Sequence, residues 1–318
     1  MVLVYSDDKR LTFELLAKAN EISKELDRRV TALLVGKYDE TLAKEYIAYG
    51  ADKVFVAETG IESFKAEEYS EILEDVLKET GCEVVLIGSN KSGKELAPRL
   101  AARLNAGCVT DCTDLYVSDG KLTVERIAYS GNAVAVEQFI SKPSVVTMLP
   151  RVVDPLPKDE KRTGEVVKKE IKVEKYPSKI VKVHEVKSGE VNVEDAEIIV
   201  SCGRGFKKKE DIQLVRELAE VLRGTTGCSR PIAADLKWLS EDHWIGLSGH
   251  KVKPRLYIAC GISGQIQHIA GMRDSDVVVA INKDPEALIF KSADYGIVGD
   301  LYEVIPKLTN VVREKMNR

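Results

Sequence analysis

The chain has 318 residues, which is enough for two ordinary domains or one large one. Hydrophobic residues make up 44% and charged residues 31%, a composition typical of soluble globular proteins. The 47 basic residues nearly balance the 51 acidic ones, and a net charge of −4 argues against a nucleic-acid-binding protein, which needs a basic excess. No apolar stretch approaches the ~20 residues that span a bilayer, and the first residues show no signal-peptide pattern. We therefore expect a cytoplasmic protein without a membrane span.

The cysteines and histidines offer little material for a metal centre. There are only four histidines, and the six cysteines contain no C-x-x-C pair. Because most cysteines lie beside apolar, Gly-rich runs, we expect them to be reduced and mostly buried. Cys108 and Cys112 are the only close pair, and a redox or metal role for them lacks a partnering histidine. We predict no metal site.

Apolar strands alternate with amphipathic helices along the first half of the chain. In segment 11–27, for example, Leu11, Leu15, Leu16, Ala19 and Ile22 recur at helical spacing. Continuously apolar strands separated by such helices indicate a parallel sheet that is covered on both faces. The predicted strands are 1–6, 29–37, 52–57 and 83–89, and the predicted helices are 11–27, 39–50, 69–81 and 94–105.

The pattern changes after about Cys112. Segment 114–139 has alternating residues and turn signals, which predict antiparallel strands added to the first domain, and strand 144–150 closes that section. Residues from about 150 to 188 form a charged, Pro-containing connector that we expect to be extended and exposed. Within it, 170–176 and 180–186 are candidate edge strands. The predicted domains are therefore 1–188 and 189–318.

The second domain also alternates strands and helices. Its predicted strands are 197–201, 255–261 and 277–284, and its predicted helices are 210–222, 264–272 and 301–316. The fold class is therefore α/β with two domains, the second of them doubly wound. Sheets of this kind bind ligands in crevices at the carboxyl ends of their strands.

Six turns of the second domain carry glycines and polar side chains. In 257–268 a strand runs into Gly261 and Gly264, and a helix starting around Ser263 would offer N–H groups to a phosphate. In Gly203-Arg204-Gly205, the guanidinium is suited to an anion, although a loop arginine with a surface partner would have the same pattern. The other four turns are 226–231, 244–249, 280–284 and 293–300.

Together these turns supply cations, hydroxyls, amides and one imidazole, that of His268. They contain no Ser-His-Asp order, no H-E-x-x-H motif and no paired carboxylates, and they match neither G-x-G-x-x-G nor a P-loop. The set favours holding a polyfunctional anionic cofactor over hydrolysis. His268 alone could be a core histidine, but its place after a Gly-rich turn favours a functional role.

The motifs GRG, GCSRP, IGLSG, LYIACGISGQIQHIAGM, AINKDPEALIF and ADYGIVGDLYEVIP closely resemble the alpha subunit of electron transfer flavoproteins. APRLAARLNAGCVTDCTDL resembles the first domain of that family, so the resemblance covers essentially the whole chain. It implies a heterodimer with a beta subunit, which the N-terminal domain would face. It also implies one FAD in the C-terminal domain and an electron carrier, not an enzyme, between dehydrogenases and a quinone-reductase-type or other acceptor.

The resemblance also implies which residues contact FAD. Arg230, Ser248 and His268 match positions against the isoalloxazine, where a cation or a donor stabilises negative charge gained on reduction. Gly261 and segment 263–267 would lie near the pyrophosphate and ribityl chain, and Asn282 and Asp300 would lie at the adenosine end. The full expected set is Arg204, Ser229, Arg230, Ile245, Gly246, Leu247, Ser248, Ser263, Gly264, Gln265, Ile266, Gln267, His268, Asn282, Asp300 and Leu301.

The chain departs from the commonest family pattern in one turn. Many members have Gln-Val-Gly-Gln-Thr-Gly where this chain has Trp244-Ile245-Gly246-Leu247-Ser248-Gly249. Trp244 and Leu247 therefore lose amide contacts, whereas Ser248 keeps a hydroxyl. His250 replaces a common Lys.

Two other functions remain open. One is the electron-bifurcating type, in which the beta subunit carries a second FAD and oxidises NADH. The other is a nucleotide-binding regulatory protein, suggested by the N-terminal α/β unit. Against the latter, segments 35–37 and 87–89 are ordinary strand ends without a phosphate-binding turn.

Overall fold

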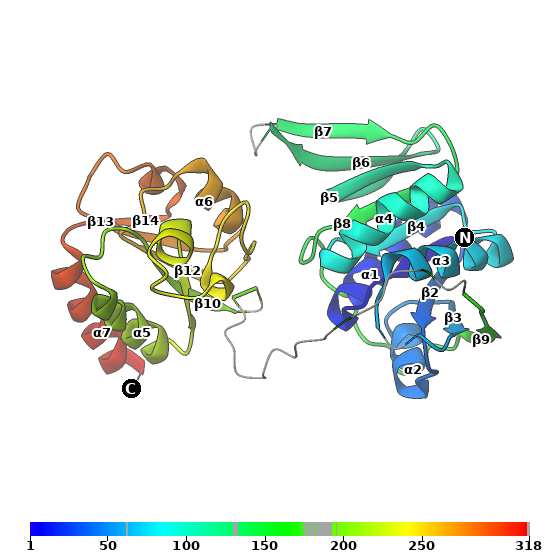
Figure 1. The fold of residues 1–318 in the computed structure, drawn as a ribbon, viewed down its shortest axis with the longest axis horizontal. Coiled ribbons are helices and arrows are strands. Elements are labelled where there is room, and N and C mark those ends of the chain that lie inside the picture. Colours follow the sequence, from blue (N-terminus) through cyan, green and yellow to red (C-terminus); the bar gives the residue numbers. More distant parts are fainter. Residues whose placement is uncertain are drawn as a thin grey trace. The chain divides into compact units, whose positions relative to one another are not determined.

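Two α/β units make up the computed structural model, which describes residues 1–61, 63–129, 133–173, 176, 181, 193–194 and 196–316. The units are Met1–Val181 and Lys182–Arg318 (Figure 1). Both contain parallel sheets flanked by helices, which confirms the predicted fold class. The expected boundary at residues 188 and 189 lies outside the described residues.

The first unit has nine strands within its described residues, in the order β7-β6-β5-β8-β4-β1-β2-β3-β9. The pairs β5–β6 and β6–β7 are antiparallel, as predicted for this region, and the other pairs are parallel. The bounds are β1 (Val2–Tyr5), β2 (Val30–Val35), β3 (Lys53–Glu58), β4 (Val84–Gly88), β5 (Gly107–Ser118), β6 (Lys121–Ala128), β7 (Ala133–Gln138), β8 (Ser144–Met148) and β9 (Glu165–Glu170).

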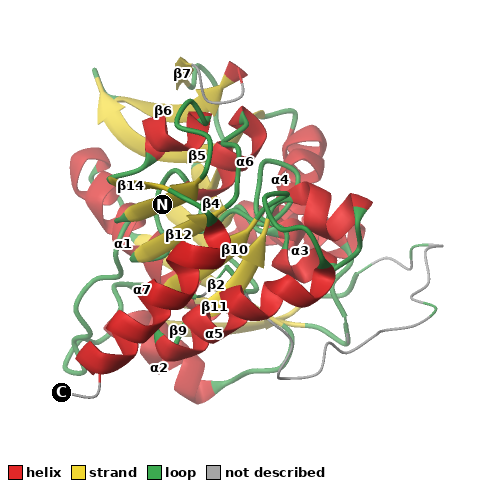
Figure 2. Ribbon diagram, turned by 90° about the vertical axis from the view of Figure 1, so that its left-hand side faces the viewer, coloured by secondary structure: helices red, strands yellow, loops and turns green. Residues whose placement is uncertain are grey.

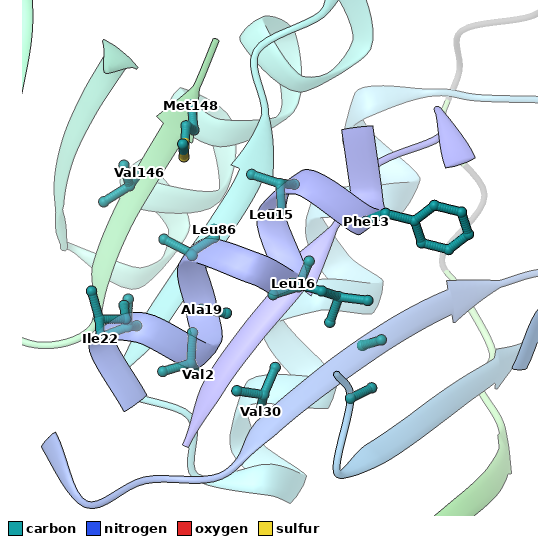
Figure 3. Packing of buried hydrophobic residues seen from close by; sticks show 14 of the residues in the cluster. Val2, Phe13, Leu15, Leu16, Ala19, Ile22, Val30, Leu86, Val146 and Met148 are labelled. Carbon is teal, nitrogen blue, oxygen red and sulfur yellow. The ribbon is translucent and has the colours of Figure 1, made fainter. Parts of the chain in front are cut away.

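Helices cover both faces of this sheet, because successive strand residues point to opposite sides. Val2 and Val4 pack in the core beneath α1 (Lys9–Leu26) and α2 (Glu40–Ala48). Leu3 and Tyr5 pack in the second core beneath α3 (Ala66–Thr80) and α4 (Lys91–Leu104). Figure 3 shows α1 side chains packed over the strands, and Figure 2 shows the helices and strands coloured by type.

Helix α1 shows how the sequence produces these layers. Asp8 caps its first turn, since Oδ1 accepts a hydrogen bond from the Leu11 N–H at 2.7 Å. Leu15, Leu16 and Ile22 are fully buried against the sheet. Each such side chain contributes roughly 1.5–3 kcal/mol through its removal from water. Asp27, in the left-handed region with φ 51°, ends the helix.

The connector differs from expectation in one respect. Segment 170–176 is a candidate edge strand, but the edge strand is β9, which pairs in parallel with β3 from residue 165 to residue 170, and the described residues 171–173 lie outside it. Most β9 residues are exposed, so backbone pairing selects the register and the side-chain pattern carries little signal. The candidate strand 180–186 lies outside the described residues, except for Val181.

The second unit has five parallel strands within its described residues, in the order β11-β10-β12-β13-β14. Three of them match the predicted strands, namely β10 (Ile198–Cys202), β12 (Leu256–Cys260) and β13 (Val278–Asn282). The other two, β11 (Thr225–Cys228) and β14 (Tyr295–Val298), were predicted only as parts of turns, which was wrong. Both are four residues long and lie at the sheet edges, where short and polar strands are common.

The two faces of this sheet carry different helices, as in a doubly wound fold. Helices α5 (Gln213–Val221) and α7 (Leu301–Met316) pack side by side on one face (Figure 1), over Val200 and Ile258. Helix α6 (Ile266–Met272) packs on the other face through Met272. Short helical segments lie at Lys209–Ile212, Pro231–Asp235, Glu241–His243 and Leu288–Ser292. Among the described helices, none combines the length and apolarity that crossing a membrane requires.

A close helix–strand approach in the first unit gives a stability prediction. A Cβ on Gly93 in α4 would lie 1.8 Å from the Gly88 carbonyl oxygen. Gly93→Ala should therefore lower the free energy of unfolding by about 1–3 kcal/mol, although Ala is the better helix former by about 1 kcal/mol. Urea unfolding measures this. Gly60→Ala is the matched control, because nothing lies within 4 Å of its added Cβ. A stabilised Gly93→Ala protein would contradict the packing.

Candidate functional site

The candidate site lies at the carboxyl edge of the second sheet, where the chain order of the strands reverses between β10 and β12. Doubly wound sheets bind ligands at this switch point. The strands end in register, because Cys202 pairs with both Cys228 and Cys260, and Cys260 pairs with Ile281. The turns that follow these strands, including 203–205, 229–230 and 261–264, therefore share one edge.

At the switch point, the backbone of the turn after β10 contacts the backbone of the turn after β12. The Gly203 N–H donates to the Cys260 carbonyl at 2.9 Å, and the Gly205 N–H donates to the Gly261 carbonyl at 3.0 Å. A Cβ on Gly203 would lie 2.4 Å from the Gly261 oxygen, and one on Gly261 would lie 2.7 Å from Leu301 Cδ1. Gly261 also has a φ of +64°. The three glycines are required for this approach and leave a rim of bare backbone.

The chain continues from Gly261 in an extended segment before α6. The helix predicted to start around Ser263 begins three residues later, at Ile266. The reason is Gly264, whose φ is +82° and whose Cβ position is filled by the Ile289 backbone nitrogen at 2.1 Å. The Ile289 N–H also donates to the Ser263 carbonyl at 3.2 Å. The side chains of Ser263, Gln265, Ile266 and Gln267 remain exposed and accessible to a ligand.

The turn 244–250 is attached to this edge from two sides. The Ile245 N–H donates to the Cys228 carbonyl at 2.9 Å, and the Leu247 N–H donates to the Gln267 carbonyl at 2.7 Å. The backbone of Gly246 packs directly against the backbone of α6, since a Cβ on Gly271 would lie 2.5 Å from the Gly246 Cα. Ile245 is fully buried, whereas Leu247 and Ser248 are exposed. The turn therefore presents Ser248 beside α6.

Two arginines at this edge are exposed cations. Arg204 lies between the glycines after β10, and Arg230 follows β11. Neither forms an ion pair or a side-chain hydrogen bond with the part of the chain that the structure describes. Ser229, next to Arg230, is buried, and its N–H donates to the Cys202 carbonyl at 3.0 Å. Unpaired guanidinium groups beside bare backbone suit an anionic ligand.

Asn282, Asp300 and Leu301 make contacts within the chain. Asn282 Nδ2 donates to the Ile262 carbonyl at 3.0 Å, and Asp300 Oδ1 accepts from the Tyr302 N–H at 2.8 Å at the start of α7. The Leu301 side chain is only 5% exposed and belongs to the core beneath the glycine turns. These three residues brace the edge, and their role as ligand contacts stays a prediction.

His268 is the one histidine among the predicted contacts, and it is buried. Its Nε2 lies 2.9 Å from the Tyr257 hydroxyl, and its Nδ1 has no hydrogen-bond partner among the described residues. Burial lowers the pKa of His268 to about 4, against a smaller opposing effect of the Ile245 backbone. His268 is therefore neutral at pH 7. Sequence reasoning assigned no role to Tyr257, whose only signal was a hydroxyl inside an otherwise apolar strand.

The cysteines are free, as predicted, and all but Cys108 are buried. Cys228, Cys202 and Cys260 occupy the last positions of three adjacent strands. Burial raises the pKa of Cys202 to about 12 and raises that of the other two further. In the described ranges, no group of three or more His, Cys, Asp or Glu residues could hold a metal ion.

The corresponding edge of the first sheet has a different character. Its switch point lies between β1 and β4, where Asp7 and Asp8 follow β1. Asn90 Nδ2 donates to the Asp7 carboxylate, and Asp8 caps α1. Two carboxyl groups at this helix start oppose phosphate binding, which agrees with the missing glycine-rich turn.

Comparison with known proteins agrees with the geometry of both units. Residues 2–174 match the family model of the electron transfer flavoprotein domain, and residues 192–273 match that of the electron transfer flavoprotein FAD-binding domain. The chain is also 40% identical over 309 residues to the electron transfer flavoprotein subunit alpha of Thermoanaerobacterium thermosaccharolyticum, covering 96% of this chain and 93% of the relative. The chain belongs to the electron transfer flavoprotein alpha-subunit family.

Other relatives of this electron transfer flavoprotein subunit have related names. The subunit alpha of Bacillus subtilis is 41% identical, over 96% of this chain and 94% of its own length. A subunit of a lactate dehydrogenase (NAD(+), ferredoxin) from Acetobacterium woodii, named LctC, is 37% identical over 96% of this chain and 74% of its own length. The family therefore includes subunits of proteins with different named activities.

The departures in the flavoprotein turn 244–249 have a structural counterpart. Trp244 packs partly buried against the core beneath α5 and α7, and a Cβ on Gly249 would lie 2.9 Å from its Cγ. Leu247 is 41% exposed. His250 lies with Nδ1 2.7 Å from a Glu194 carboxylate oxygen. Trp244 thus acts in packing, where the commonest family pattern has an amide.

The neutral His268 predicts a pH dependence of stability. Unfolded histidine takes up a proton near pH 6.5, but folded His268 does so only near pH 4. Because the unfolded state binds more protons in this window, stability falls as the pH decreases, by about 3 kcal/mol at pH 4. Urea unfolding followed by tryptophan fluorescence reports on this unit, which contains both tryptophans, Trp238 and Trp244.

The matched variant is His268→Gln, which keeps a polar side chain that does not titrate. Its stability should fall less steeply between pH 7 and pH 4 than that of the wild type. Equal slopes for the two proteins would show that folded His268 titrates normally, against the structure.

Proposed function

We propose that the C-terminal unit binds FAD and that the chain, paired with a beta subunit, carries electrons between dehydrogenases and an acceptor. The observation that carries this is the carboxyl edge between β10 and β12, where the turns at Gly203, Gly205 and Gly261 adjoin Arg204 and Arg230, neither of which has a side-chain partner in the described ranges. The dinucleotide's pyrophosphate is an anion that needs close approach and cations. Because the N–H groups of the three glycines already donate to backbone carbonyls, the two guanidinium groups would supply the charge-assisted hydrogen bonds. The orphaned Nδ1 of His268 adds a buried polar group without a partner in the described chain.

Each part of the edge has a role in this proposal. Arg204 and the turns 203–205 and 261–264 hold the pyrophosphate, and Ser263, Gln265 and Gln267 offer polar groups to the ribityl chain. Arg230, Ser248 and His268 adjoin the isoalloxazine. Asn282 and Asp300 lie at the adenosine end. The side chains of both already form hydrogen bonds within the chain, and Oδ1 of Asp300 accepts from the Tyr302 N–H. Asp300 would therefore offer the ligand mainly its other carboxylate oxygen.

The bound flavin would accept electrons from one partner and give them to another. The chain's own contribution is electrostatic, because the Arg230 guanidinium stabilises negative charge gained on reduction. His268 is uncharged at pH 7 because burial lowers its pKa to about 4, so it acts as a neutral hydrogen-bonding group. Positive charge at the ring therefore comes from the arginine.

The names of the relatives support a two-subunit assembly. Those from Thermoanaerobacterium thermosaccharolyticum and Bacillus subtilis are called subunit alpha of an electron transfer flavoprotein, which implies a beta subunit. In this proposal the chain works in the cytoplasm, and its N-terminal unit has a structural role and faces the beta subunit. The donor is a dehydrogenase, and the acceptor is a quinone-reductase-type or other redox protein.

Removal of Arg230 tests the placement of the isoalloxazine. Arg230→Ala should lower the first reduction potential of the bound flavin, because one charged hydrogen bond is worth about 1.5–3 kcal/mol. For a one-electron couple this corresponds to about 60–130 mV. A reductive titration of the purified heterodimer gives the value.

The control is Arg255→Ala, which removes the same charge at the opposite end of β12, where the side chain is exposed. Its potential should equal that of the wild type. If Arg230→Ala still binds FAD with an unchanged potential, Arg230 does not adjoin the ring.

Flavin counting tests the alternative function. The name of the LctC relative contains NAD(+) and ferredoxin, so an electron-bifurcating assembly with a second FAD in the beta subunit is the second candidate. A simple carrier should release one FAD and one AMP per heterodimer on denaturation, whereas the bifurcating type should release two FAD. A colourless heterodimer that stays free of flavin after addition of FAD would contradict both candidates.

A further inference from the structure

Tyr257 and His268 form a buried polar pair beneath the candidate site. Tyr257 lies in β12 and is fully buried, and its hydroxyl is 2.9 Å from Nε2 of His268 in α6. The surrounding side chains are the apolar core on this face of the sheet, which includes Ile199, Val278 and Met272. A phenol hydroxyl in such surroundings requires a hydrogen-bond partner, and the imidazole supplies it.

The direction of this hydrogen bond follows from the chemistry of the pair. Burial raises the pKa of Tyr257, which stays protonated, and lowers the pKa of His268 to about 4, so both groups are neutral at pH 7. A phenol hydroxyl is a better donor than a neutral imidazole N–H, and an imidazole nitrogen is a better acceptor than a phenol oxygen. The Tyr257 hydroxyl therefore donates the hydrogen bond, and Nε2 of His268 accepts it.

The tautomer of His268 follows from this bond. A neutral imidazole carries one proton, and since Nε2 accepts from Tyr257, that proton is on Nδ1. Nδ1 is buried and has no partner at hydrogen-bond geometry within the described residues, and the Ile245 backbone lies only near enough to oppose part of the fall in the pKa of His268. An orphaned buried donor is costly, so a ligand acceptor at this position would gain a strong interaction.

We propose that Tyr257 is a positioning residue for the flavin site, holding His268 as the Nδ1–H tautomer so that it offers the flavin an uncharged hydrogen-bond donor. The proposal rests on the proposed function, because it explains how the tautomer of His268 in that flavin site is fixed. Tyr257 itself does not touch the ligand. Its hydroxyl fixes the imidazole ring and its proton from below, as the second partner of a histidine does in metal and catalytic sites.

The first test needs no variant. Two-dimensional ¹⁵N–¹H NMR of the heterodimer, labelled at histidine, distinguishes the two neutral tautomers and the charged form. His268→Gln assigns the His268 signal among the four histidines. The proposal expects a neutral ring with the proton on Nδ1 at pH 7, with and without FAD. A proton on Nε2, or a charged ring, overturns it even if every Tyr257 variant fails to fold.

The second test is Tyr257→Phe, which removes only the hydroxyl. Loss of the bond should allow the Nε2–H tautomer, weaken FAD binding about fivefold and lower the flavin potential. Tyr295→Phe is the matched control, because Tyr295 lies in the same sheet and is 66% exposed. If Tyr257→Phe keeps the wild-type tautomer and potential, Tyr257 has only a packing role and the proposal fails.

The outcomes distinguish a failure of the proposed FAD binding from a failure of the role proposed for Tyr257. A wild-type heterodimer that binds no FAD refutes the proposed function, and this proposal with it. A wild-type heterodimer that binds FAD, combined with an unchanged Tyr257→Phe protein, refutes the role of Tyr257 alone.

Discussion

The second unit depends on one constraint, the direct approach of two backbone turns after β10 and β12. Gly203 and Gly205 hydrogen-bond to the carbonyls of Cys260 and Gly261, and a Cβ at any of the three glycines would collide with a neighbour. This contact brings the turns that follow the central strands to one edge, and Leu301 of α7 supports it from below. Because the rim is backbone, charge must come from the residues beside it, and Arg204 and Arg230 are there.

Around this rim, charged and neutral groups are separated by burial. The two arginines are exposed and lack side-chain partners among the described residues. His268 is 7% exposed and packs with Tyr257 on the apolar face of the sheet. Its burial keeps it neutral at pH 7. A site of this kind can hold an anion at its surface while it presents an uncharged donor from within.

Much of the fold and the position of the site could be predicted from the sequence, for reasons that also explain the errors. Strands such as Ile198–Cys202 and helices such as α1 bury continuous or periodic apolar faces, so hydrophobic pattern identifies them. The strands β11, β14 and β9 are short or exposed, and their existence depends on backbone pairing with distant strands. The start of α6 depends on the contact of Gly264 with Ile289, and the Tyr257–His268 pair on folding across eleven residues, neither of which has a local signal.

Cys228, Cys202 and Cys260 end three adjacent strands beneath the rim, and their burial determines how reactive their thiols are. A thiol attacks or is oxidised through its thiolate, and burial keeps all three protonated. Sulfur that lies one residue before the turns of the candidate site is thereby withheld from disulfide exchange and from oxidants. The strand ends keep a compact, polarisable side chain in the core, so none of these three sulfurs presents a reactive thiolate beside the turns that we propose to bind the flavin.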